Sequence, residues 1–218
     1  MNFEWPVIYS SMPALLKGAE LTIYITVIGL IGGMATGLLF GLMRAYGNGF
    51  IRAIATLYIG LIRGTPIVVQ VMFIYFALPM LISLRVDPLS AAIVTIIVNS
   101  GAYIAEIVRG SFQSVAKGLH EAGLALGLPR WRVLAFVVGP VAFRRMVPPL
   151  GNQFIFSLKD TSLLAVIGVG ELTRPGTIVV ATNFKAVEIY TLVAILYLMM
   201  TLSISFILRI IERKMDVS

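Results

Sequence analysis

Long apolar runs separated by short charged segments are the main pattern along this chain. Four runs contain no charged residue and are close to the roughly 20 residues that a membrane-spanning helix needs: residues 21–43, 64–84, 88–105 and 189–208. A fifth apolar stretch, 146–170, is interrupted near its middle by Lys159 and Asp160. We predict a span there too, because both flanks are apolar and the charge distribution requires it. The pattern therefore predicts five transmembrane helices.

The basic residues give these spans an orientation. With the N-terminus outside, 4 of the 17 lysines and arginines fall on the outer side and the other 13 (17 − 4) are assigned to the cytoplasmic side. The outer four are Lys17, Arg85, Arg174 and Lys185. Because basic residues accumulate in cytoplasmic segments, we predict an extracytoplasmic N-terminus, a cytoplasmic C-terminus and a cytoplasmic segment of about residues 111–145 between spans three and four.

Two features refine the first span. Before it, apolar and aromatic side chains recur at helical spacing between Trp5 and Leu16, which predicts a helix of about residues 3–17 lying in the membrane interface. A loosely ordered tail is equally consistent with a chain terminus. Within the span, glycines at every fourth position form a smooth ridge on which another helix can pack closely. These are Gly29, Gly33, Gly37 and Gly41.

Composition supports a membrane protein and excludes several functions. The chain is 59% hydrophobic and 12% charged, with a mean hydropathy of +0.97, whereas a soluble domain is about a quarter charged. We therefore expect one all-α integral membrane domain over residues 1–218. The sequence has no cysteine for disulfides or thiol chemistry. Its net charge of +7 is scattered between apolar runs, unlike a nucleic-acid-binding face. With a single histidine, His120, we expect no metal site.

The stretch HEAGLALGLPRWRVLAFVVGP, residues 120–140, breaks the apolar pattern with charges, glycines and prolines. Gly127 can take the left-handed position after a helix and Pro129 cannot continue one. We therefore expect one helix to end near Leu126 and another to start near Arg130. A surface of small residues beside apolar knobs either docks into a groove of another protein or folds against its own bundle. The small residues expected at this surface are Ala122, Gly123, Ala125 and Gly127.

The order of residues in this stretch resembles the E-A-A-x3-G-x9-I-x-L-P signature of permease subunits in ATP-binding-cassette importers. Glu121, Ala122, Gly127 and Pro140 match it at the same spacing. The departures keep small or apolar side chains: Gly123 for the second Ala, Val137 for Ile and Gly139 for Leu. In that family the segment is a coupling helix seated in a cleft of the cytoplasmic ATPase subunit. The resemblance therefore implies ATPase coupling by Glu121, Ala122, Gly123, Gly127 and Pro140.

The resemblance covers most of the chain. Four further segments look like the polar amino acid permease group (histidine, glutamine, arginine), most of all its bacterial glutamine permease subunits. They are RGTPIVVQVMFIYFALP (63–79), NSGAYIAEIVRG (99–110), PPLGNQFIFSLKDTSL (148–163) and IGVGEL (167–172). The group's pattern implies a permease dimer in the cytoplasmic membrane, two cytoplasmic ATPase subunits and an extracytoplasmic binding protein that delivers the substrate. We expect a homodimer, and a close relative as the second permease subunit stays open. The sequence has no G-x-x-x-x-G-K-[ST] loop, so we expect no cofactor on this chain and ATP with Mg²⁺ on the ATPase.

Polar side chains at membrane depth are the candidates for the substrate pathway, because they are costly there and usually functional. At about 1.5 Å per residue, Asn99, Gln70 and Asp160 lie near mid-membrane. Asn99, Tyr103 and Glu106 are spaced i, i+4 and i+7, so they share one helix face. We expect Asp160 or Glu106 to attract an ammonium or guanidinium group, while Asn99, Gln70 and hydroxyls satisfy a carboxylate.

These candidates also have structural interpretations. Lys159 and Asp160 point about 100° apart on a helix, so either could bond a neighbouring helix and hold the bundle together. Glu106 and Arg109 lie one turn apart near the cytoplasmic end of their span and could form a local ion pair.

The R-G-T-P turn that opens the second predicted span, residues 63–66, has a mainly structural interpretation. Pro66 suits the first turn of a helix, and Arg63 suits the cytoplasmic membrane surface.

Three functions compete at this point. The first is the permease subunit of an ATP-driven importer for a polar amino acid, either glutamine or a basic one. The second is an ion-coupled secondary carrier or channel that uses Glu106 and Asp160 as cation sites, and the third is a membrane-embedded enzyme. The coupling segment favours the first, because a self-powered carrier has no need of a docking helix. An enzyme is disfavoured because the cytoplasmic segments offer no acid–base constellation. The identity of the amino acid stays open.

Overall fold

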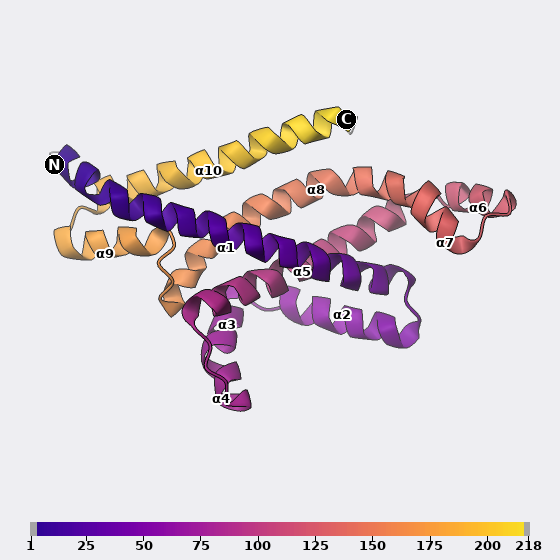
Figure 1. Cartoon of the computed structure of the whole chain (residues 1–218), viewed down its shortest axis with the longest axis horizontal. Helices are drawn as coiled ribbons and strands as arrows, with labels where there is room; N and C mark the ends of the chain where they lie inside the picture. The colour runs from indigo at the N-terminus through magenta and orange to yellow at the C-terminus, as the bar shows by residue number, and fades with distance from the viewer. Residues whose placement is uncertain (1–3, 216–218) are drawn as a thin grey trace.

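The computed structural model describes residues 4–215, and within them all the regular elements are helices (Figure 1). In chain order they are α1 (Trp5–Tyr46), α2 (Gly49–Arg63), α3 (Ile67–Met72), the π-helical η1 (Phe73–Ala77), α4 (Leu78–Ile82), α5 (Pro88–Ser114), α6 (Lys117–Ala125), α7 (Arg130–Arg132), the π-helical η2 (Val133–Val138), α8 (Gly139–Asp160), the 3₁₀-helical η3 (Thr161–Ile167), α9 (Thr173–Asn183) and α10 (Ala186–Lys214). The predicted all-α class is confirmed, and the orientation across the membrane stays a prediction.

The structure has four candidate spans, or five if one bent pair of helices counts as a single span, against the five expected. Four are long and apolar enough to cross a membrane by themselves: α1, α5, the run Arg130–Ile167 and α10. The fifth is a pair, Gly49–Arg63 and Ile67–Ile82, which passes the same test only together and is bent by 103°. The polar pair Lys159–Asp160 lies at the end of α8 inside the third of the long runs, so a charged pair is compatible with a continuous helical unit there.

The second unit differs from the predicted span 64–84. Its first half, α2, contains Arg52 and ends at Arg63, so the uncharged run between these two arginines is too short to be recognised as a span from hydropathy. The bend occurs at Gly64–Pro66, where Pro66 takes an extended conformation and caps α3. A proline at this point cannot continue α2 because it lacks the backbone N–H that the helix requires.

The N-terminal segment is part of the first long helix. From Trp5 onward it runs without a break into the span, so there is no separate helix over 3–17 among the described residues, and the alternative of a loose tail does not hold from Trp5 on. Leu15, which belongs to the apolar stripe between Trp5 and Leu16, is fully buried in a cluster with Leu172, Ile189 and Val193. Whether Trp5 lies in the membrane interface stays a prediction.

The glycine ridge of α1 packs against α5, as its spacing predicts. All four ridge glycines are buried, and each faces a different residue of α5. The facing residues are Ile96, Ser100, Ile104 and Val108. A Cβ added at Gly37 would lie 2.5 Å from Ile104 Cγ2, well inside van der Waals contact. The absence of side chains at these four positions of α1 therefore allows the backbones of α1 and α5 to approach closely.

The segment between α5 and α8 is a helical hairpin at one end of the molecule, opposite the end that holds α9 and the N-terminus (Figure 1). As expected, α6 is capped at Leu126, Gly127 takes the left-handed conformation with φ +76°, and the next helix begins at Arg130. The expected exposure of Gly123 is wrong. Gly123 is buried against Val133 of η2, where an added Cβ would lie 2.9 Å from a valine methyl. Because glycine has no side chain, α6 can pack closely against Val133 of η2 in the hairpin.

Candidate functional site

A pocket between α3, α5 and α8 brings together three of the five predicted pathway residues. Its volume is about 430 Å³. The predicted residues at its wall are Asn99 and Tyr103 from α5 and Asp160 from the end of α8. The other lining residues are Thr65, Pro66, Ile67, Gln153 and Phe156. The elbow between α2 and α3 therefore forms one part of the wall, and a face of α8 forms another.

Gln70 supports this wall without lining the pocket. Its side chain is 7% exposed. The Nε2 group donates to the carbonyl oxygens of Ile62 at 2.7 Å and Thr65 at 3.0 Å, and Oε1 accepts from Asn99 Nδ2 at 2.9 Å. Two carbonyl groups that the bend removes from the helical pattern thereby gain a partner, as buried backbone requires in a membrane. The same amide fixes the orientation of Asn99 at the pocket wall.

Asp160 carries the negative charge of the pocket. Among residues 4–215 its carboxylate takes part in no ion pair. The neighbouring Lys159 does not enter the pocket lining, and its ammonium lies 5.6 Å from the centre of the Phe156 ring. The two adjacent charges are therefore directed to different partners, as their angular separation on a helix predicts.

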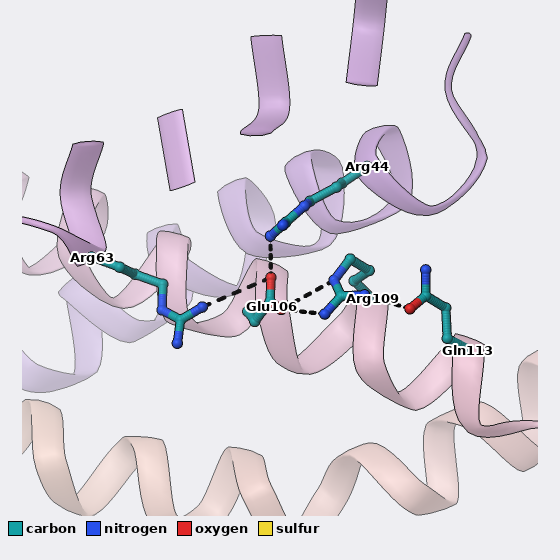
Figure 2. A network of polar contacts seen from close by, with 5 residues as sticks. All are labelled: Arg44, Arg63, Glu106, Arg109 and Gln113. Atoms are coloured by element: carbon teal, nitrogen blue, oxygen red, sulfur yellow. Dashed lines mark hydrogen bonds and ion pairs between the residues drawn. The ribbon is translucent and has the colours of Figure 1, made fainter. Parts of the chain in front are cut away.

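Glu106 is not among the residues that line the pocket. It lies one turn beyond Tyr103 on α5 and is surrounded by three arginines (Figure 2). Arg44 contacts Oε2, Arg109 contacts Oε1, and Arg63 Nη1 lies 3.9 Å from Oε2. The ion pair between Glu106 and Arg109 is thus present, and it belongs to a larger network that also includes helices α1 and α2. Glu106 lies at the centre of this network, and its role in the substrate pathway stays a prediction.

Sequence reasoning missed three polar or aromatic residues of the pocket: Gln153, Phe156 and Thr65. Gln153, Phe156 and Asp160 lie at i, i+3 and i+7 on α8, so helical spacing from Asp160 would have found the first two. Gln153 is buried and donates from Nε2 to Ser157 Oγ at 3.2 Å. Thr65 belongs to the elbow, whose position next to α5 and α8 has no signal in the local sequence.

A second pocket of about 570 Å³ lies where the hairpin meets the ends of α1 and α5. Glu121 lines it together with Lys117 and His120, and Tyr46 lines it from the end of α1. Of the five residues expected to couple to an ATPase, Glu121, Ala122, Gly127 and Pro140 are exposed, and Gly123 is buried as described above.

Comparison with known proteins decides the family. Residues 33–217 match the family described as binding-protein-dependent transport system inner membrane components. The chain belongs to this family. It is 56% identical over 218 residues to the glutamine transport system permease protein of Escherichia coli (strain K12), covering 100% of both chains. It is 31% identical to the arginine transport system permease protein of Bacillus subtilis (strain 168), covering 99% of this chain and 98% of that one.

A solved structure supports the same assignment. A crystal structure of an amino acid ABC transporter with histidines superposes with a TM-score of 0.91 at 32% identity, covering 98% of this chain and 100% of that chain. The expected family is therefore confirmed. This inner membrane component is a permease subunit of an ABC importer, located in the cytoplasmic membrane, and it is a transporter component with ATP hydrolysis by a separate ATPase.

Proposed function

We propose that this permease conducts a polar amino acid, with glutamine as the first candidate, through the pocket formed by α3, α5 and α8. The observation that carries the proposal is the lining of this pocket, which combines the Asp160 carboxylate with the amides of Asn99 and Gln153 and the phenol of Tyr103. An α-amino acid presents an ammonium group and a carboxylate. Asp160 is suited to the former, and the N–H and O–H donors are suited to the latter. A volume of 430 Å³ is in the range of small-molecule sites, which starts at about 300 Å³.

The choice of glutamine is supported by the full-length likeness to a glutamine permease protein. A basic amino acid is the second candidate, because Asp160 offers an uncompensated negative charge and another relative is named for arginine. Asn99 and Gln70 would act as one unit in either case, since Gln70 holds Asn99 in place. The pocket is best tested by transport, because amino acids bound at such sites are passed on rather than retained.

The partners follow from the same proposal. Two copies of this chain would enclose one pathway, two ATPase subunits with ATP and Mg²⁺ would bind at the cytoplasmic end, and an extracytoplasmic binding protein would deliver the amino acid. The α6–α7 hairpin is the proposed ATPase contact. Two of its apolar side chains, Leu126 and Trp131, are 80% and 60% exposed, and exposed aromatic anchors of this kind are typical of protein interfaces. Glu121 and Ala122 would touch the ATPase, while Gly123, Gly127 and Pro140 shape the hairpin.

Uptake by the complete transporter is expected to require ATP on the cytoplasmic side. In sealed vesicles with the binding protein on the opposite side, radiolabelled glutamine should accumulate only when ATP is supplied, and a protonophore should leave the initial rate unchanged. Vesicles that contain the permease without the ATPase serve as the control and should show no accumulation. Uptake driven by an ion gradient in those control vesicles would instead establish an ion-coupled carrier.

Bulk added at the exposed Ala122 is expected to weaken ATPase binding without disturbing the hairpin. Ala122→Trp projects from α6 into open surroundings, so the permease should insert and keep its thermal midpoint while less ATPase co-purifies with it. Gly123→Trp is the matched contrast, because its side chain would displace Val133 and should lower the thermal midpoint as well. Undiminished co-purification with Ala122→Trp would show that this face of α6 is not the contact.

A further inference from the structure

Gln153 is the amide that α8 contributes to the pocket, and part of its hydrogen-bonding capacity is unused. The residue is 7% exposed and lines the pocket. Its one hydrogen bond within residues 4–215 runs from Nε2 to Ser157 Oγ at 3.2 Å, so Oε1 accepts none there. The described part of the chain has no fully buried side-chain oxygen or nitrogen that lacks a partner. Oε1 is therefore accessible, and its place in the lining directs it to the pocket.

Gln153 and Asp160 mark two ends of one face of α8. They lie at i and i+7, so they are two turns or about 10 Å apart along the helix axis and only about 20° apart around it. Phe156 lines the same pocket between them. The α8 part of the wall therefore presents a carboxylate and an amide that are separated by an aromatic surface.

This separation suits an extended glutamine. With bonds of about 1.5 Å, glutamine spans about 6 Å from its α-ammonium nitrogen to its terminal amide nitrogen. A hydrogen bond of about 3 Å at each end gives a total of about 12 Å between the protein groups. The two side chains can reach this from backbone positions about 10 Å apart. Asparagine is shorter by one methylene group, which places one of the two contacts out of reach, and arginine is longer.

The chemistry at the Gln153 end favours a neutral amide. Oε1 is an acceptor, so it can bind the NH₂ group of glutamine but cannot pair with a carboxylate side chain. Gln153 lies on the hairpin side of Asp160, and Tyr103 lies on the hairpin side of Asn99, because α5 enters the hairpin and α8 leaves it. The Arg63 guanidinium carbon is 5.3 Å from the centre of the Tyr103 ring, so a cationic side chain at this end would meet like charge.

We propose that Gln153 is the specificity-determining residue of the pocket, which pairs with the side-chain amide of glutamine while Asp160 binds the α-ammonium group. Asn99 and Tyr103, which line the pocket from α5, then remain for the α-carboxylate. The assignment rests on the proposed function, because it takes this pocket to be the substrate site.

Protection of a thiol in the pocket measures which amino acids bind there. The chain contains no cysteine, so Ile67→Cys places a single thiol of this subunit at the pocket wall. The assembled permease–ATPase complex is purified in detergent, where a soluble maleimide has access from both sides, and labelling of the permease chain is followed by mass. The probes are glutamine, asparagine, glutamate and arginine. Glutamine is expected to halve the labelling rate at a concentration roughly fivefold below that of asparagine or glutamate, the value of one hydrogen bond.

Adding Gln153→Glu keeps the shape of the side chain and replaces the amide by a carboxylate. The half-protecting concentration of arginine should fall roughly tenfold relative to that of glutamine, because a guanidinium gains a charge-assisted hydrogen bond. Gln153→Leu removes the amide, so glutamine should lose its advantage over asparagine. Asn152→Asp is the matched control: it places the same charge one residue away on α8, but Asn152 lines a separate pocket with α10. The order of the four probes should stay that of Ile67→Cys alone.

Three results would overturn the assignment. The first is equal protection by glutamine and asparagine with Ile67→Cys alone. The second is an arginine-to-glutamine ratio that Gln153→Glu leaves unchanged, and the third is an equal change of this ratio with Asn152→Asp, which would indicate a general effect of negative charge on α8.

The assignment can be decided even if one variant yields no complex. If Gln153→Glu is not recovered, Gln153→Leu decides: loss of the glutamine advantage supports the assignment and its retention excludes it. If neither is recovered, the order of the four probes with Ile67→Cys alone decides. Lack of protection by all four amino acids would instead be a failure of the proposed function, which would remove the assignment with it.

Discussion

Gly41→Ala is expected to destabilise the permease by about 1–3 kcal/mol, the usual cost of overfilling a packed interface. The added Cβ would lie 2.6 Å from Val108 Cβ and 2.7 Å from the carbonyl oxygen of Ala105. Neither atom is the end of a flexible side chain, so relief requires α1 and α5 to move apart along a contact that the other ridge glycines share. The measurement is the thermal midpoint of the purified permease in detergent, which should fall by about 2–4 °C for each kcal/mol.

The matched control is Gly110→Ala, on the helix that faces Gly41. A Cβ at Gly110 would meet no atom within 4 Å, and alanine is favoured over glycine in a helix by about 1 kcal/mol. Its thermal midpoint should stay unchanged or rise. If Gly41→Ala and Gly110→Ala behave alike, the ridge does not set the distance between α1 and α5.

The outcome at the glycine ridge shows which features local spacing can predict. A repeat of four residues fixes which side chains share a helix face, so the ridge and the α5 face with Asn99 and Tyr103 were both predictable. The stop at Gly127 was predictable for a similar reason, since backbone conformation after a helix depends on the residue itself. These predictions required no knowledge of how distant segments meet.

Features that depend on tertiary contacts could not be predicted in this way. Gly123 was expected at the surface because small residues resemble a docking notch, but Val133 folds back onto it across the turn. Glu106 was a pathway candidate because it shares a face of α5 with Asn99 and Tyr103. Its ion-pair partners, however, depend on where the fold places Arg44 and Arg63. The elbow contains Pro66, which is visible in the sequence. Hydropathy nevertheless predicted a span that starts at this elbow, because the uncharged part of α2 between Arg52 and Arg63 is too short to be recognised.

The arrangement of charges in the pocket follows from these tertiary contacts as well. Within residues 4–215, Asp160 is the only carboxylate that lines the pocket, because Glu106 lies outside the lining and is paired with its arginines. Lys159 is directed towards Phe156, so Asp160 has no cation of its own in the described residues. An unpaired carboxylate among apolar helices is costly, and a cationic group of the substrate would relieve that cost.

Asp160→Asn is therefore expected to reduce ATP-driven uptake roughly ten- to hundredfold for a cationic substrate, since a hydrogen bond to a charged group is worth about 1.5–3 kcal/mol. If the carboxylate holds the substrate side chain, arginine uptake should decrease more than glutamine uptake. The initial uptake rates of both should be measured at equal expression together with basal ATPase activity.

Asp87→Asn is the matched control. It removes the same charge outside the pocket, and asparagine can keep the hydrogen bond from Ser90 N that caps α5. Equal loss for both substrates together with lost basal ATPase activity would assign Asp160 to structure or coupling. An unchanged uptake profile would remove it from the substrate site.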